Sequence, residues 1–170
     1  ASVSITGPVT LTTDGGTGIT IDTDAAAHGG SITFASTATI DGNHSLTLIS
    51  GAGDIALQGV IGGDTAIASL SVNATDGDDG NIEIANIGDA TGVGVVGTAS
   101  IGNSDTAELK LDGTIYSTGG ATIYESAAGG NIKVTGVNVT VSTTAANLTF
   151  DNGDLVLSAD GTTTIITGST

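Results

Sequence analysis

The stretch GGNIKVTG, residues 129–136, contains the pattern that decides the fold of this chain. Its apolar residues Ile132 and Val134 alternate with the polar residues Asn131 and Lys133. Strict alternation predicts a β-strand with one buried face, because successive side chains of a strand point to opposite sides. The two leading glycines favour a tight turn into that strand, where a Cβ atom would be costly.

The same x-apolar-x-apolar phrase recurs along the chain. It occurs seven times, and its copies start 23, 23, 27, 27, 23 and 23 residues apart, at residues 8–11, 31–34, 54–57, 81–84, 108–111, 131–134 and 154–157. A second apolar phrase follows most copies, at residues 18–21, 45–48, 69–72, 121–123 and 147–150. A shorter third piece lies between them, at residues 38–40, 59–61, 85–87, 113–115 and 137–139. In the fourth copy Val93, Val95 and Ile101 compete for the second phrase.

Three short strands for every 23–27 residues predict one turn, or rung, of a coil. A rung cannot bury its apolar residues alone, so it stacks on the next copy. Each strand then pairs in parallel with its equivalents above and below, about 4.8 Å away, so that about seven rungs span roughly 34 Å. The sequence therefore predicts an all-β fold, a parallel β-helix that forms a single solenoid over residues 1–170.

Two columns of apolar side chains are expected inside this coil. The first column consists of Ile32, Ile55, Ile82, Leu109, Ile132 and Leu155. The second column consists of Phe34, Leu57, Ile84, Leu111, Val134 and Leu157. The side chains of each column are buried only if every rung covers the next one.

Residues 31–63, SITFASTATIDGNHSLTLISGAGDIALQGVIGG, resemble the β-strand repeats of bacterial filamentous-haemagglutinin-like surface proteins. Repeats of that family often read N-I-T-F, V-D-G, L-T-L and G-x-G-x-I, and this stretch has S-I-T-F, I-D-G, L-T-L and G-A-G-D-I in the same order. The resemblance implies a right-handed parallel β-helix, secretion, and a role as the shaft of a large adhesin or filament. It is clearest over residues 29–84, and no binding head is recognisable in the chain.

The composition excludes several classes of partner. The chain has 18 acidic residues against two Lys and no Arg, and its net charge of -16 repels nucleic-acid phosphates and anionic membrane surfaces. It has no Cys, which excludes disulfides and thiolate metal sites. No apolar run approaches the roughly 20 residues of a membrane span. We therefore expect no nucleic-acid partner and no membrane insertion.

Candidate metal ligands are few in this sequence. Asp76, Asp78 and Asp79 lie in the stretch NATDGDDGN, residues 73–81, and clustered carboxylates can bind calcium through oxygen. The spacing of an EF-hand loop is missing, so a solvated acidic turn is the other interpretation. The two histidines have no His or Cys at zinc-site spacing. We expect no cofactor, and calcium at the three aspartates is the one candidate.

Enzyme function is also considered, because parallel β-helices host polysaccharide lyases and hydrolases. Such lyases use Arg or Lys as a base, and this chain has no Arg. Lys110 and Lys133 follow Glu83 at one-rung intervals, which predicts a solvated charge ladder with Glu83 and Lys110 paired across a rung. We expect no catalysis. The alternative is a carbohydrate-binding or carbohydrate-cleaving β-helix that uses Tyr116 and Tyr124 as exposed stacking platforms, and ice binding is a distant third because the outward positions form no uniform Thr lattice.

The ends of the repeat predict how the protein assembles. Strand pattern begins at residue 2 in SVSITGPVTL and persists in TTTIITGST, without the polar cap or covering helix of an isolated solenoid. We expect a segment of a longer rod, or a subunit that stacks end to end on itself into a filament. The function hypothesis is a structural and adhesive extracellular β-helix on a bacterial cell surface, with host or matrix glycans as further partners.

Overall fold

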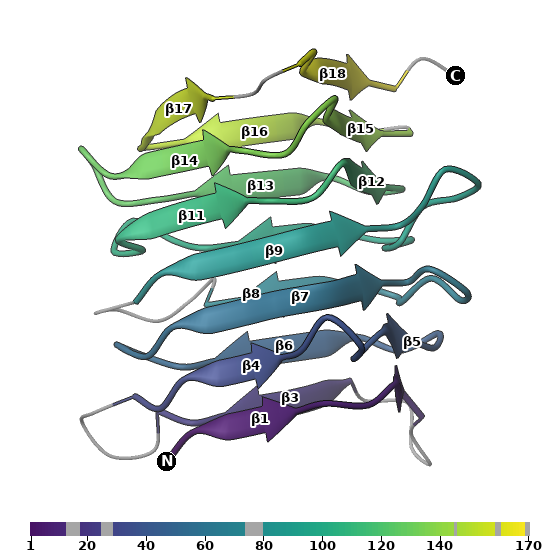
Figure 1. Ribbon diagram of the computed structural model, residues 1–170, viewed down its shortest axis with the longest axis vertical. Helices are drawn as coiled ribbons and strands as arrows, with labels where there is room; N and C mark the ends of the chain where they lie inside the picture. Colours follow the sequence, from purple (N-terminus) through teal and green to yellow (C-terminus); the bar gives the residue numbers. More distant parts are fainter. Residues whose placement is uncertain (13–17, 25–28, 74–79, 145, 159–160, 169–170) are drawn as a thin grey trace.

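The computed structural model describes residues 1–12, 18–24, 29–73, 80–144, 146–158 and 161–168, and these residues form β-strands and turns without any helix (Figure 1). The strands stack in parallel around one apolar core, and they complete about six turns. In Figure 1 the front strands run from left to right and the rear strands return behind them as the chain rises, so the coil is right-handed. The predicted fold class is confirmed.

The first face of the solenoid is the longest stack of strands. Its order is β1 (Val3–Ile5), β4 (Ile32–Phe34), β7 (Ile55–Ile61), β9 (Ile82–Ile87), β11 (Glu108–Leu111), β14 (Asn131–Val134) and β17 (Asp154–Leu157). The register places Ile32 opposite Ile55, and the same match continues rung by rung to Leu155. Phe34 begins a second, parallel series of matches that ends at Leu157.

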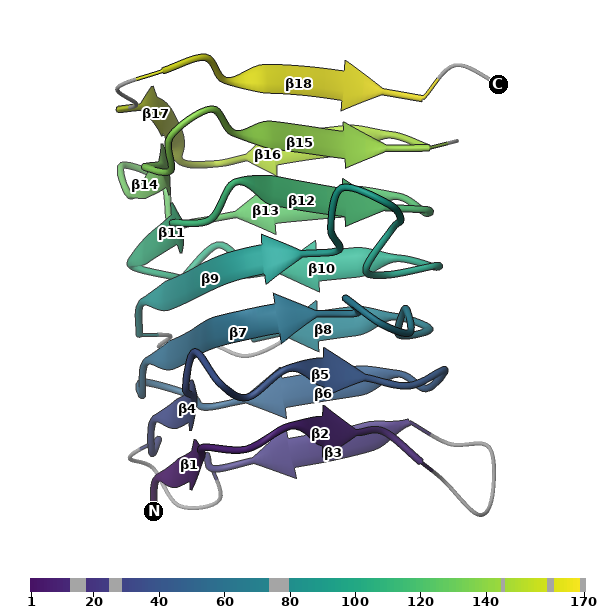
Figure 2. The ribbon, with the colours of Figure 1, turned by 45° about the vertical axis from the view of Figure 1, so that its right-hand side comes forward.

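Two further faces complete each rung (Figure 2). The second face contains the ends of β7 and β9 together with β2 (Val9–Thr10), β5 (Ile40–Asp41), β12 (Ile115–Thr118), β15 (Thr140–Thr143) and β18 (Thr164–Thr167). The third face contains β3 (Ile19–Asp22), β6 (Leu46–Ile49), β8 (Leu70–Val72), β10 (Ala99–Ile101), β13 (Thr122–Glu125) and β16 (Leu148–Asp151). In the ambiguous fourth copy, the strand is the one that contains Ile101, and Val95 forms only isolated bridges at a corner.

Two expectations about strand phase are wrong. The phrase at residues 8–11 is not the first copy of the first face, because Val3 lies opposite Ile32, 29 residues later, and Val9 lies opposite Ile40 on the second face. Both segments show the same alternation of apolar and polar residues, and only the pairing with the next rung shows which face each belongs to. On the second face the predicted piece at residues 113–115 is out of phase, because Tyr116 and not Ile115 lies opposite Ile87 and is fully buried.

The corners between faces are too close-packed for side chains at some positions. A Cβ atom on Gly113 would lie 1.4 Å from the backbone oxygen of Ala85 in the rung below. Among the described residues other than glycine, three adopt left-handed backbone angles, and all three are asparagines: Asn73, Asn138 and Asn152. Asn tolerates this region better than most residues, which explains its use at these turns.

A row of buried polar side chains lies where the third face turns into the first. Ser50 N donates to Asn73 Oδ1 at 2.8 Å, and Asn73 Nδ2 donates back to Ser50 Oγ at 3.0 Å. Asn103 Nδ2 continues the row by donating to the backbone oxygen of Asn73 at 2.9 Å. The sequence does not predict this buried row, because Asn and Ser are common in exposed turns.

Candidate functional surfaces

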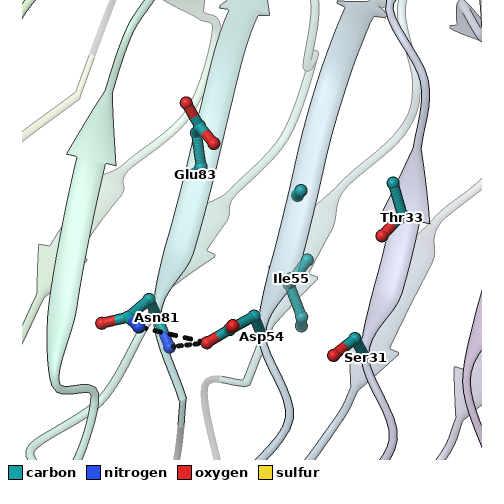
Figure 3. Close-up of a pocket in the computed structure, with 7 residues that line it drawn as sticks. Ser31, Thr33, Asp54, Ile55, Asn81 and Glu83 are labelled. Atoms are coloured by element: carbon teal, nitrogen blue, oxygen red, sulfur yellow. Dashed lines mark hydrogen bonds between the residues drawn. The ribbon is translucent and has the colours of Figure 1, made fainter.

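The outer side of the first face carries a shallow hollow (Figure 3). Its volume is about 290 Å³, and its lining residues are Ser31, Thr33, Asp54, Ile55, Ala56, Asn81 and Glu83. The hollow arises because the small Ala56 lies between the longer side chains of Thr33 and Glu83 in the outward row. Asp54 Oδ1 accepts hydrogen bonds from the backbone and side-chain nitrogens of Asn81, at 2.8 and 3.2 Å, so this carboxylate already joins two rungs.

Lys110 is held in an acidic setting on the same face. Its Nζ lies 3.0 Å from Glu83 Oε1 on the neighbouring rung and 3.1 Å from Asp112 Oδ1, so the predicted Glu83–Lys110 pair is confirmed. The hydrogen bond to Glu83 raises the pKa of Lys110 above its usual value. The pKa of Asp112 is lowered, first by a hydrogen bond from Thr135 and then by Lys110. Each of these side chains is about a third exposed or more, so the pairs contribute little to stability.

Lys133 does not extend that ladder. It lies directly opposite Lys110 in the register, and like charges at such positions repel. Its Nζ donates instead to Glu108, which lies two residues before Lys110 on the neighbouring strand. The two lysines are the only Lys or Arg residues in the chain, so its net charge stays strongly negative at -16.

A second hollow, of about 210 Å³, lies beside the second face. It is lined by Thr39, Asp41, Val60, Gly63, Asp64 and Asp89. Asp41 Oδ1 accepts from the backbone nitrogens of Asp64 and Thr65, at 2.9 and 3.1 Å. Asp89 Oδ1 accepts from the hydroxyl and backbone nitrogen of Thr91, both at 2.7 Å, and these bonds lower the pKa of Asp89. Both carboxylates therefore stabilise turns.

Three aspartates are the calcium candidates that the sequence analysis named. Asp76, Asp78 and Asp79 lie outside the described residues. Within those residues no group of three or more His, Cys, Asp or Glu side chains is placed to hold a metal ion.

The expected aromatic platforms are buried, which corrects the prediction for Tyr116 and Tyr124. Both tyrosines are 0% exposed. Tyr116 Oη donates to the backbone oxygen of Ile84 at 2.8 Å, and the ring of Tyr124 stacks on Phe150 with centroids 5.4 Å apart. Burial raises the pKa of both phenols. Phe34, the fourth aromatic residue of the chain, is 1% exposed, and Phe150 is partly buried against the core, so none of the four rings is fully exposed for a sugar to stack on.

Apolar side chains are exposed mainly at the end of the solenoid formed by β17 and β18. Leu155 and Leu157 continue the two predicted columns but are 39% and 52% exposed, and Ile165 and Ile166 are 45% and 48% exposed. The counterparts of Leu155, Leu157 and Ile165 in the middle of the solenoid are 0–1% exposed, because a rung lies on each side. Ile166 differs, because it lies opposite the outward Ser142. The columns are therefore buried by stacking, and a terminal rung of described residues leaves them open.

No described helix is long and apolar enough to cross a membrane. Comparison of the chain with protein-family models, with curated proteins and with solved structures found no match.

Proposed function

We propose that this solenoid is structural material: the shaft, or a segment of the shaft, of an adhesive protein on a bacterial cell surface. The supporting observation is the uninterrupted stack from β1 to β17, in which each rung serves mainly to cover the next. The two hollows described on the outer surface are shallow, and the carboxylates of Asp41, Asp54 and Asp89 that line them are engaged in turns and rung-to-rung bonds. Residues 31–63, with their resemblance to filamentous-haemagglutinin-like repeats, supply the link to adhesion and secretion.

Host or matrix glycans are part of the same proposal as targets of the whole adhesive protein. A carbohydrate site on this chain has weaker support, because Tyr116 and Tyr124, the rings predicted to stack on sugars, are buried in the core.

Immunogold labelling of intact cells that make the protein tests the location. Antibodies against residues 1–170 should label filaments or the cell surface without permeabilisation, and deletion of the gene should reduce attachment to host cells or matrix. Labelling only after permeabilisation would refute the proposal. A glycan array probed with the purified chain separates the alternative, since tight binding to one sugar class would favour a carbohydrate-recognising β-helix.

A further inference from the structure

The first face of the solenoid carries both lysines of the chain and a hollow lined by carboxylates. Lys110 and Lys133 point outward from β11 and β14, and the hollow over Ala56 lies on β7 of the same stack. Asp54 and Glu83 line this hollow and point away from the core (Figure 3). The chain has no other Lys or Arg, so its lysines share one face with an acidic hollow that neither of them lines.

We propose that a second copy of this chain docks on the first face, side by side with the first copy and antiparallel to it. The two-fold axis lies between the two faces, parallel to the strands, at the level between β9 and β11. Both copies then use the same surface, as in the commonest symmetric dimers. This inference goes beyond the proposed shaft function, because a single shaft needs no lateral contact.

The symmetry fixes which strands meet. In the pair β11 lies over the partner's β9, β14 lies over the partner's β7, and β17 lies over the partner's β4. Rotation about an axis parallel to the strands keeps each residue at its position along the strand, so each outward column of side chains faces itself. The first outward column is Ser31, Asp54, Asn81, Glu108, Asn131 and Asp154, and the second is Thr33, Ala56, Glu83, Lys110, Lys133 and Val156.

The lysines then meet carboxylates of the partner. Lys110, which already lies 3.0 Å from its own Glu83, faces the partner's Glu83, so four charges of alternating sign surround the axis. Lys133 faces the partner's Ala56 and enters the hollow beside the partner's Asp54. The two copies are therefore complementary in charge at the centre of the contact, although each copy is strongly acidic as a whole.

Charge also selects one level for the axis. Glu108 faces the partner's Asn81, and Asp154 faces the partner's Ser31, so neither carboxylate meets another charge. A shift of the axis by half a rung toward β9 would set Glu108 against the partner's Asp54. The same shift toward β11 would set Asp154 against the partner's Asp54. Like charges directly opposite one another are destabilising, so both alternatives are unfavourable.

The hollow has room for the lysine that enters it. Its volume is about 290 Å³, and the five heavy atoms of a lysine side chain need about 150 Å³ at roughly 30 Å³ for each water-sized group. Asp54 Oδ1 accepts both bonds from Asn81, and within the described part of the chain no bond reaches Asp54 Oδ2. An ammonium has three donors, so Lys133 keeps its bond to Glu108 while it donates to the partner's Asp54.

The size of the face predicts a weak contact. Six strands about 4.8 Å apart and four residues of about 3.3 Å each cover roughly 29 by 13 Å, or ~380 Å² of each copy. Standard stable interfaces bury about 800 Å² of each partner, so this pair belongs to the transient class. We therefore expect a dimer that forms at high protein concentration, in about 0.15 M salt, where repulsion between the acidic copies is screened beyond about 8 Å.

Charge reversal tests the contact by sedimentation velocity. In Lys133→Glu a new carboxylate meets the partner's Asp54, and in Asp54→Lys a new ammonium meets the partner's Lys133. Each variant alone should form several-fold less dimer than the unsubstituted chain. An equimolar mixture of the two variants should restore the dimer, because both lysine–carboxylate contacts are then rebuilt between unlike copies. Asp64→Lys is the matched control, since it changes the net charge equally at an exposed position outside the first face.

Circular dichroism of each variant shows whether the solenoid is folded, and the mixture supplies the decisive result for folded variants. A monomer at every concentration of the unsubstituted chain would overturn the docking. Single variants that dimerise as well as Asp64→Lys would also overturn it, and so would a mixture that stays monomeric. None of these results would touch the shaft proposal, because immunogold labelling tests the location of the protein without reference to association.

Cross-linking tests the antiparallel register, because the chain has no native Cys. Packed sheets lie about 10 Å apart, so a bifunctional maleimide of about that length can join opposed thiols. Thr33→Cys mixed with Val156→Cys should give several-fold more linked dimer than Thr33→Cys mixed with Ser71→Cys, an outward position on the third face. A higher yield from Thr33→Cys alone would show parallel copies, and a yield equal to the Ser71→Cys control would show no docking on the first face. Either result would overturn the proposed pair.

Discussion

Replacing Leu109 with Ala would test whether the apolar columns hold the solenoid together. Leu109 is 0% exposed, and it lies between Ile82 and Ile132 in successive rungs. The substitution removes three carbons, worth about 2.4 kcal/mol at ~0.8 kcal/mol per buried CH₂. A residual cavity of roughly 50 Å³ adds about 1.2 kcal/mol at ~24 cal/mol per Å³. We therefore expect a loss of about 3.5 kcal/mol in the free energy of unfolding.

Leu155→Ala is the matched control, because Leu155 occupies the same column in the last rung but is 39% exposed. Less apolar surface is lost there and no closed cavity forms, so we expect a loss of about 1–1.5 kcal/mol. Urea unfolding followed by circular dichroism measures both variants, and the slope with urea concentration should stay unchanged. Equal losses for Leu109→Ala and Leu155→Ala would refute the view that covering rungs on both sides stabilise the column.

Three further results are expected. Gly113→Ala should lower the unfolding free energy by several kcal/mol, on the order of an overpacked core, because its Cβ would meet the Ala85 oxygen. Gly92→Ala should change the unfolding free energy little, because nothing lies within 4 Å of a Cβ there, and similar urea midpoints for the two variants would contradict the corner packing. The phenols of Tyr116 and Tyr124 have a pKa raised above the usual 10.0, so the stability that they contribute is complete below about pH 10 and is lost as the pH rises above it. Absorbance at 295 nm should therefore rise only together with loss of the β-strand signal in circular dichroism, and ionisation in the folded protein at pH 10 would count against their burial. Raising NaCl from roughly 10 to 500 mM should raise the melting temperature, since salt screens the self-repulsion of a chain with net charge -16 more than it weakens the few exposed lysine pairs. A melting temperature that falls with added salt would show that the lysine pairs contribute more to stability than the self-repulsion removes.

Part of the outer surface was predictable from the sequence. The Glu83–Lys110 pair followed from spacing alone, because a one-rung interval places two outward residues side by side. The two hollows were not predicted, since they depend on the relative lengths of side chains from different rungs and on loop paths. The buried pair of Ser50 and Asn73 was missed for a similar reason: a polar residue at a corner looks the same in sequence whether the corner points in or out.

The sequence by itself determined the parallel coil and the residues that align from Ile32 onward. A repeated spacing and a strict alternation are local properties, and each rung presents the same apolar residues to the next. The tertiary structure decided which residues point inward wherever two neighbouring residues or segments fit the apolar pattern equally well. It placed Val3 and not Val9 on the first face, and it turned Tyr116 inward where Ile115 was expected. The physical reason is that two things set the inward side at these positions: the number of residues in the corner turn, and the pairing with the strand one rung away. Neither can be read from the alternation of neighbouring residues.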